Sequence, residues 1–323
     1  MTDPLHTALL AVAGTRATAR LAGARADVML DVTSLDASAR GAMEVAVRAA
    51  ALAVPGVEEV RVAQTSERVG RTLIAVASGK GGVGKSTVAA NLAVALARTG
   101  RHVGLVDADI YGPSQPRLMS AEGTRPEARD KQLIPVPTRW GVPMLSMGQL
   151  VEPGRALAWR GPMAAGALGQ MVDADWGATD LLILDLPPGT GDVQLTMIQK
   201  HKPAGAVIVS TPQDLALLDA RRAIDLFVKA GIPIIGLLEN MAGYRCPHCG
   251  ELSDPFGRGG AEAAAAELDI PFLGRVPLTI AIRAASDAGQ PPAAQDGDTV
   301  FAPLAAQLTA WLGNRREGPA FVR

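Results

Sequence analysis

Short apolar runs alternate with longer segments of helical periodicity from residue 71 to the end of the chain. The apolar runs predict buried strands at residues 73–77, 102–107, 144–147, 180–185, 206–210, 232–239 and 272–276. Buried strands that alternate with helices are typical of a doubly wound, mainly parallel sheet. We therefore predict an α/β fold, whose ligands bind at the carboxyl ends of the strands.

A smaller block of apolar periodicity precedes this region. Residues 26–32 alternate like a strand, residues 36–53 have the pattern of a helix, and residues 57–62 predict another strand. The sequence therefore predicts a small α/β domain over residues 1–67, followed by a larger domain over residues 71–323.

The C-terminal segment carries an apolar stripe at helical spacing, formed by Val300, Phe301, Leu304, Leu308, Trp311 and Leu312. A stripe of this kind packs into a domain core or lies on a membrane surface. Because no basic residues except Arg315, Arg316 and Arg323 follow it, we predict that it packs into the core.

Composition narrows the class of protein. The 323 residues are 48% hydrophobic and 20% charged, and their net charge of −1 indicates neither nucleic acid nor an anionic membrane as a partner. No apolar run approaches the roughly 20 residues that span a bilayer. An apolar piece at residues 9–13 follows Asp3, where a secretory signal would carry positive charge. We expect a cytoplasmic protein, with a transit peptide as the alternative.

Residues 74–87 carry the main chemical signal, because an apolar strand runs into a glycine-rich turn and then into an alanine-rich helix. Gly79, Gly84, Lys85 and Ser86 have the spacing of a P-loop, in which backbone N–H groups and a helix N-terminus bind phosphate. We expect Lys85 to reach the outer phosphates and the Ser86 hydroxyl to bind Mg²⁺. The candidate nucleotide-binding residues of this loop are Gly79, Lys80, Gly81, Gly82, Val83, Gly84, Lys85, Ser86 and Thr87.

Carboxylates end two other predicted strands. Asp107 and Asp109 lie at the end of strand 102–107, where two neighbouring acids need a cation or a water between them. Asp185 follows an apolar run in the Walker B arrangement, which delivers a carboxylate to the coordination shell of Mg²⁺. These residues are predicted to face the phosphate-binding loop.

Asn240 follows strand 232–239 and is the candidate for recognising the base. A side-chain amide can pair with adenine through both its donor and its acceptor. An isolated asparagine at such a position is more often a turn residue, so both interpretations stay open.

The chain has two cysteines, Cys246 and Cys249, in the sequence Cys-Pro-His-Cys. Thiolates at this spacing suit zinc or iron, and a closed site needs four such ligands. Because one chain supplies two, the count favours a homodimer in which both chains share one centre on the symmetry axis. A dithiol redox pair and a bridging structural zinc are the alternatives.

Several motifs resemble one known family. Lys-Gly-Gly-Val-Gly-Lys-Ser at residues 80–86 is similar to the deviant P-loop of dimeric ATPases that include partition and septum-site proteins, nitrogenase iron protein and Mrp-type iron-sulfur carriers. Asp-Leu-Pro-Pro-Gly-Thr-Gly-Asp at residues 185–192 and Cys-Pro-His-Cys-Gly-Glu at residues 246–251 resemble the Mrp-type carriers in particular. The similarity covers residues 73–288. Residues 54–62 are similar to the small domain that precedes many of these ATPases, although this block has no cysteine.

The resemblance implies roles for individual residues. It implies that Lys80 reaches across a dimer to the partner's nucleotide, that Asp109 orients or deprotonates the attacking water, and that Asp107 supports Mg²⁺ through its water shell. It implies that Asn240 contacts adenine. Cys246 and Cys249 would then bind a bridging, labile 4Fe-4S cluster destined for other proteins.

We therefore predict a homodimeric, ATP-binding iron-sulfur cluster carrier with slow ATPase activity. The predicted catalytic residues are Lys80, Lys85, Asp109 and Asp185, and the predicted metal ligands are Ser86, Asp107, Asp185, Cys246 and Cys249. Its expected partners are a cluster-assembly scaffold and apo iron-sulfur proteins, without nucleic acid or membrane. The alternatives are a positioning ATPase and an ATPase with a structural bridging zinc.

Overall fold

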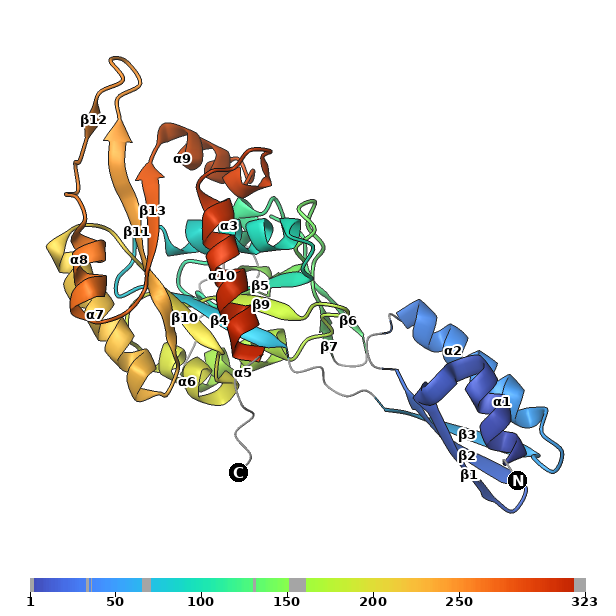
Figure 1. Ribbon diagram of the computed structural model, residues 1–323. Helices are drawn as coiled ribbons and strands as arrows, with labels where there is room; N and C mark the ends of the chain where they lie inside the picture. The colour runs from blue at the N-terminus through green and yellow to red at the C-terminus, as the bar shows by residue number, and fades with distance from the viewer. Residues whose placement is uncertain are drawn as a thin grey trace. The chain divides into compact units, whose positions relative to one another are not determined.

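The computed structural model describes residues 3–32, 35, 37–65, 71–129, 132–150 and 161–316 (Figure 1). The chain divides into two compact units, Met1–Arg71 and Thr72–Arg323. The domain boundary predicted at residue 67 and the first residue of the helix predicted at residues 36–53 lie outside the described residues.

The first unit is a three-stranded sheet with two helices. Its elements are α1 (Pro4–Ala13), the 3₁₀ turn η1 (Gly14–Arg16), β1 (Ala17–Ala22), β2 (Arg25–Asp31), α2 (Ala37–Leu52) and β3 (Glu59–Thr65). β2 is antiparallel to β1 and parallel to β3. The strands and the helix predicted from residue 26 onward are confirmed, whereas α1 and β1 were not predicted.

Helix α1 accounts for the apolar piece near the N-terminus. Asp3 accepts a hydrogen bond from the N–H of Leu5 at 3.0 Å, and Pro4 occupies the first helical position, which is a favourable start for a helix. Leu5 and Leu9 are buried against the sheet of this unit. This segment therefore belongs to the core of the first unit.

The second unit contains the remaining elements of the described chain. Its strands are β4 (Thr72–Ala77), β5 (Val103–Asp107), β6 (Glu127–Arg129), β7 (Gln132–Ile134), β8 (Met144–Ser146), β9 (Leu181–Asp185), β10 (Gly205–Ser210), β11 (Ile234–Arg245), β12 (Leu252–Ser253) and β13 (Phe272–Leu278). Its helices are α3 (Lys85–Arg98), α4 (Gln115–Leu118), α5 (Gly161–Val172), α6 (Asp192–His201), α7 (Asp214–Lys229), α8 (Gly260–Glu267), α9 (Ile280–Asp287) and α10 (Phe301–Arg316), with 3₁₀ turns η2 (Met147–Gln149) and η3 (Pro292–Ala294).

Eight strands form one sheet in the order β12-β11-β10-β4-β9-β5-β8, with β13 also paired to β11. All pairs are parallel except β11 with β12. Ile74 and Val76 of β4 pack with α3 and α10 on one face, whereas Leu73 and Ala75 pack with α5 to α8 on the other. The predicted doubly wound, mainly parallel sheet is confirmed.

Strand β11 is longer than predicted. It was expected to end at Glu239, but it continues to Arg245, where Tyr244 and Arg245 pair with β12. Figure 1 shows β11 and β12 extending beyond the other strands as a hairpin. The Cys-Pro-His-Cys segment is the turn of this hairpin, and β12 was not predicted.

Helix α10 confirms that the C-terminal apolar stripe packs into the core. Phe301, Leu304, Leu308 and Leu312 are buried against α3 and the sheet. The stripe is therefore not available to a membrane surface. Across the described ranges, the helices are too short or too polar to cross a bilayer.

We predict that alanine in place of Gly104 destabilises the sheet that carries the predicted carboxylates. A Cβ at this position of β5 would lie 2.6 Å from the Trp176 ring and 2.7 Å from Leu182 of β9. Overpacking of this kind costs about 1–3 kcal/mol, which urea unfolding followed by circular dichroism would measure. Gly166→Ala in α5, where no atom lies within 4 Å of the new Cβ, is the matched control and should be neutral or stabilising. Equal stabilities would contradict the close packing of β5.

Candidate functional site

The phosphate-binding loop joins β4 to α3. Gly82 and Gly84 have φ angles of 78° and 81°, which only glycine adopts without strain, and Gly84 is the N-cap of α3. No side chain caps this helix, so its first N–H groups are available to an anion. A Cβ at Gly79 would overlap the backbone of Asp219 in α7. The loop therefore has the backbone geometry of a P-loop.

Lys85 forms a buried ion pair with Asp185. The lysine Nζ donates to Oδ1 of Asp185, and the two side chains are 6% and 0% exposed. Gln115 donates from Nε2 to the other carboxylate oxygen at 2.8 Å and to the carbonyl of Ser86 at 2.9 Å. The structure thus brings together Lys85, Ser86 and Asp185, as the motifs predict.

Asp107 lies beside Asp185 because the two residues are partners in the register of β5 and β9. Its carboxylate accepts hydrogen bonds from the N–H groups of Ser114 and Gln115, both at 3.1 Å, and from the Ser146 hydroxyl at 2.9 Å. Burial and the neighbouring charge of Asp185 nevertheless raise the pKa of Asp107 to about 7. A cation at this site would relieve both effects.

The donor atoms at this edge of the sheet fit Mg²⁺. The carboxylates of Asp107 and Asp185 and the hydroxyl of Ser86 are oxygen ligands, which this ion prefers. Oε1 of Gln115 is buried and has no hydrogen-bond partner among the described residues. This orphaned acceptor suits a water molecule in the coordination shell of the ion.

Asp109 is buried, with 8% exposure, in the turn after β5. Its Oδ1 accepts hydrogen bonds from the N–H groups of Tyr111 at 3.1 Å and Gly112 at 3.2 Å. The carboxylate thus shapes the turn. Its role toward an attacking water stays a prediction.

Lys80 is half-buried in the same loop, and its carbonyl accepts a hydrogen bond from the Ser78 hydroxyl at 2.9 Å. Its ammonium group makes no hydrogen bond or ion pair with any other residue that the structure describes. This leaves the charge of Lys80 without a partner in the described part of one chain.

Asn240 lies against the P-loop. Its Nδ2 donates to the carbonyl of Val83 at 2.7 Å, and a Cβ at Gly84 would overlap this nitrogen. The side chain is 7% exposed. Asn240 is therefore neither an exposed turn residue nor distant from the nucleotide-binding loop, and its contact with adenine stays a prediction.

The two thiols lie at the tip of the β11–β12 hairpin. Cys246 donates from its N–H to the carbonyl of Glu251 and accepts at its own carbonyl from the N–H of Gly250, both at 2.9 Å. The N–H groups of Cys249 and His248, together with the Cys249 thiol, hold the pKa of the Cys246 thiol below its usual value. The turn thus stabilises a thiolate, which is the form that binds a metal.

One chain does not complete a metal centre around the thiols, because the described ranges contain no group of three or more His, Cys, Asp or Glu side chains that could hold an ion. Both cysteines are free thiols, and Cys249 is exposed. The thiol pair is therefore half of a four-ligand site at most.

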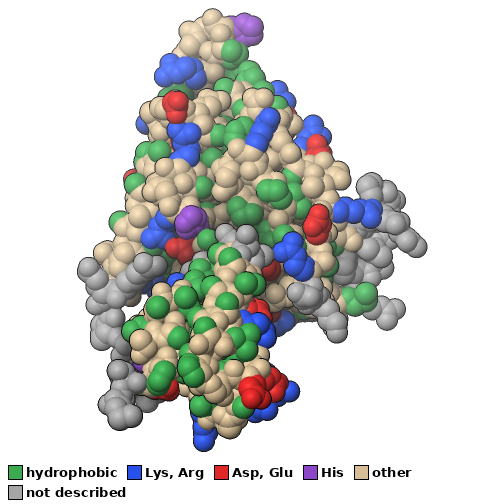
Figure 2. Space-filling model, turned by 90° about the vertical axis from the view of Figure 1, so that its right-hand side faces the viewer, with side chains coloured by type: hydrophobic (Ala, Val, Ile, Leu, Met, Phe, Trp, Pro, Cys, Tyr) green, Lys and Arg blue, Asp and Glu red, His purple; other side chains and the backbone are tan. Residues whose placement is uncertain are grey.

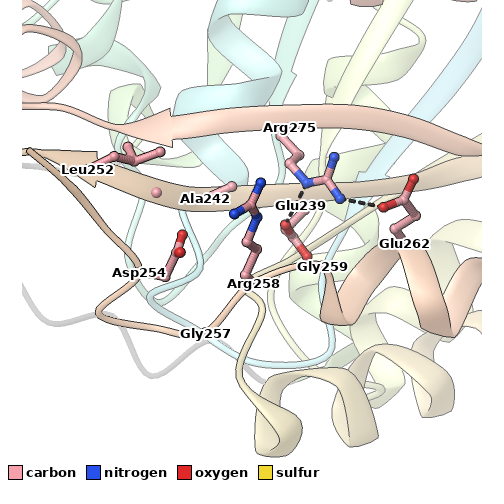
Figure 3. A pocket seen from close by; sticks show the side chains of 10 residues that line it. Glu239, Ala242, Leu252, Asp254, Gly257, Arg258, Gly259, Glu262 and Arg275 are labelled. Atoms are coloured by element: carbon pink, nitrogen blue, oxygen red, sulfur yellow. Dashed lines mark hydrogen bonds and ion pairs between the residues drawn. The ribbon is translucent and has the colours of Figure 1, made fainter.

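A cavity of about 460 Å³ lies beside the base of this hairpin (Figure 3). Buried Glu239 accepts hydrogen bonds from the N–H of Ala261 at 2.9 Å and from Nε of Arg275 at 3.1 Å. Arg275 also pairs with Glu262, while Arg258 extends into the cavity from the loop before α8. This charged wall fixes the base of β11 to α8 and β13.

The sequence did not predict Gln115 or Ser146 as site residues. Gln115 begins a four-residue helix and Ser146 ends a three-residue strand, and neither belongs to a recognisable motif. The polar residues near the ends of predicted strands are the one signal that could have indicated Ser146.

A family model confirms the resemblance indicated by the motifs. The ParA model, described as NUBPL iron-transfer P-loop NTPase, matches residues 70–311. An iron-sulfur cluster carrier protein of Pseudomonas fragi is 49% identical over 246 residues, covering 75% of this chain and 85% of that protein. The iron-sulfur cluster carrier protein of Deinococcus radiodurans is 44% identical over 301 residues, covering 90% of this chain and 85% of that protein.

Solved structures support the same fold. A nucleotide-binding protein of Archaeoglobus fulgidus, in complex with ADP, is 41% identical with a TM-score of 0.60, covering 68% of this chain and 87% of that one. The cell division ATPase MinD of Pyrococcus furiosus has a TM-score of 0.55 at 24% identity, covering 74% and 99%. From the P-loop, the Walker B aspartate and these matches together, the chain belongs to the NUBPL-type iron-transfer P-loop NTPases of the ParA family.

Proposed function

We propose that this protein is an ATP-dependent carrier that binds a 4Fe-4S cluster between two copies of the chain and delivers it to apoproteins. The observation that carries the proposal is the pair of free thiols at the tip of the β11–β12 hairpin, which supplies two of the four ligands that a closed cluster site requires. Relatives at 44–49% identity bear the name of iron-sulfur cluster carriers. The cluster is cargo, received from an assembly scaffold in the cytosol.

Lys85, the loop amides and Ser86 would bind ATP with Mg²⁺, and Asp107 and Asp185 would support the ion. When bound, Mg²⁺ neutralises charge on the phosphates and polarises the bond that is cleaved. Lys85 exchanges its pairing with Asp185 for the outer phosphates, and Asp109 orients the attacking water. We expect ATP hydrolysis to be slow, since the proposed task of hydrolysis is to control the binding and release of the cluster.

In the dimer, the partner subunit would complete two sites, the nucleotide site and the thiol site. The unpaired ammonium of Lys80 suits a phosphate of the nucleotide on the partner subunit, where it stabilises charge that develops during phosphoryl transfer. The two hairpins would supply four thiolates to one cluster. ATP binding and cluster binding are then coupled through one interface.

The positioning-ATPase alternative receives less support. Its membrane version needs an exposed amphipathic helix, whereas the stripe on α10 is buried. Its DNA version needs a basic surface, whereas Figure 2 shows basic and acidic side chains interspersed on the face that it displays. Neither version assigns a task to the thiol pair.

We predict that anaerobic reconstitution with iron and sulfide yields a brown protein with about one cluster per dimer. The measurements are the visible spectrum, the iron, sulfide and zinc contents, and the mass of the assembly. The variant Cys246→Ser/Cys249→Ser should bind neither iron nor sulfide. Colourless protein with tightly held zinc would instead favour the structural bridging zinc.

We predict that Lys85→Met lowers the free energy of unfolding by about 3–5 kcal/mol, because it leaves the buried Asp185 carboxylate without its countercharge. The double variant Lys85→Met/Asp185→Leu should recover most of this loss, since it removes both charges. Neither variant should bind ATP by calorimetry. A single variant as stable as the parent chain would show that this pair is not buried in solution.

We predict that two inactive variants restore ATPase activity when they are mixed. Lys80→Ala keeps an intact nucleotide site, and Lys85→Ala supplies Lys80 from the partner subunit. Random exchange of subunits should restore about a quarter of the parent activity, because half of the dimers then hold one complete site of two. Mixing Lys80→Ala with Lys80→Ala/Lys85→Ala is the control. Activity restored in the control, or in neither mixture, would refute action across the dimer.

A further inference from the structure

The side chain of Asn240 fastens β11 to the phosphate-binding loop. Its Nδ2 donates to the carbonyl of Val83 at 2.7 Å across 157 positions of sequence. Asn240 and Val83 are 7% and 2% exposed, so solvent scarcely competes for this bond. The peptide that joins Val83 to Gly84 therefore has one defined hydrogen-bond partner.

The planarity of that peptide gives the bond a consequence for phosphate. In a trans peptide the C=O and the N–H point in opposite directions. A Val83 carbonyl held by Asn240 therefore directs the N–H of Gly84 away from Asn240, to the side on which a P-loop binds phosphate. The bond selects one of two orientations of this peptide.

Glycine at position 84 makes the selection necessary. Glycine adopts both orientations of the preceding peptide readily, so the local backbone does not enforce either. The next peptide is fixed independently, because the Gly84 carbonyl accepts from the N–H of Val88 at 3.0 Å. With Asn240 in place, both peptides that flank Gly84 are held.

We propose that Asn240 is a positioning residue for the phosphates of the nucleotide, because it holds the Val83–Gly84 peptide with the Gly84 N–H directed at them. The inference rests on the proposed nucleotide site. It differs from recognition of adenine, since a peptide held in this way improves the binding of any polyphosphate and does not discriminate between bases.

Calorimetry with the full-length chain tests this inference, with ATP and inorganic tripolyphosphate as ligands in the presence of Mg²⁺. Asn240→Ala should weaken both by a similar factor of about 10 to 100, the effect of one hydrogen bond to a charged group. Weakening of ATP alone would show that Asn240 acts on the base and would overturn the inference. Unchanged binding of both ligands would also overturn it.

Asn91→Ala is the matched control. Asn91 is 1% exposed and also donates from its amide to a backbone carbonyl, that of Thr87 at 2.8 Å, but within α3. The Asn91→Ala substitution should lower the melting temperature, while the affinities for ATP and tripolyphosphate stay within about twofold of the parent values. An equal loss of affinity in this variant would show that any lost buried amide weakens the site.

The parent chain supplies a measurement that needs no substitution. On addition of tripolyphosphate, the backbone N–H resonance of Gly84 should shift downfield, while the side-chain amide of Asn240 stays hydrogen-bonded to Val83. A Gly84 resonance that does not respond would overturn the inference even if Asn240→Ala fails to fold. A parent chain that binds neither ATP nor tripolyphosphate would instead refute the proposed nucleotide site.

Discussion

The buried ion pair between Lys85 and Asp185 is the interaction on which the rest of the site depends. Removing a lysine from water costs several kcal/mol, so Lys85 is stable there only because β9 ends in a carboxylate next to β4. Gln115 binds the second oxygen of the same carboxylate and the Ser86 carbonyl. The phosphate-binding loop and the turn after β5 are thereby joined through one side chain.

Asp107 adds a second buried acid beside this ion pair, so Lys85, Asp107 and Asp185 together carry one excess negative charge when all three are ionised. A polyphosphate would increase that charge, and we therefore expect ATP to bind together with its metal ion.

The sequence predicted the site best where a strand ends in a residue that can bind a ligand. Apolar runs that end in Asp107 and Asp185 predicted both the strands and the carboxylates, because parallel strands end at the same edge of a sheet. Helix α1 was missed because its apolar residues resemble part of a targeting segment. The end of β11 was missed because its last residues pair with the two-residue strand β12 and, at Tyr244, with the end of β13 after a shift of register. Hydrogen bonds of Gln115 and Asn240 connect residues 70 and 157 positions apart, so no local pattern could have predicted them.

Strand β11 serves both halves of the proposed mechanism. Asn240 contacts the phosphate-binding loop, and Cys246 follows the end of the same strand at the hairpin tip. Between them, Met241 has a φ angle of 59°, and the pairing of β11 with β13 shifts register between Asn240 and Tyr244. A non-glycine residue in this region is strained, which marks the point where the hairpin departs from the sheet. The hydrogen bond of Asn240 therefore fixes the part of β11 next to the phosphate-binding loop. The irregular backbone after Asn240 begins the hairpin, where fewer contacts hold the strand.

An incomplete thiol site is a physical advantage for a carrier. In the proposed dimer each chain would supply two thiolates, so part of the free energy of cluster binding would be the free energy of bringing two chains together. Anything that weakens this dimer would then weaken cluster binding, without a change at the thiols themselves. Lys80, if it reaches the partner's nucleotide, makes the dimer more stable with ATP than after its hydrolysis. Linkage requires that the cluster favour ATP binding by the same factor by which ATP favours the cluster. A closed four-cysteine site within one chain would lack this control, since its affinity would not depend on the partner.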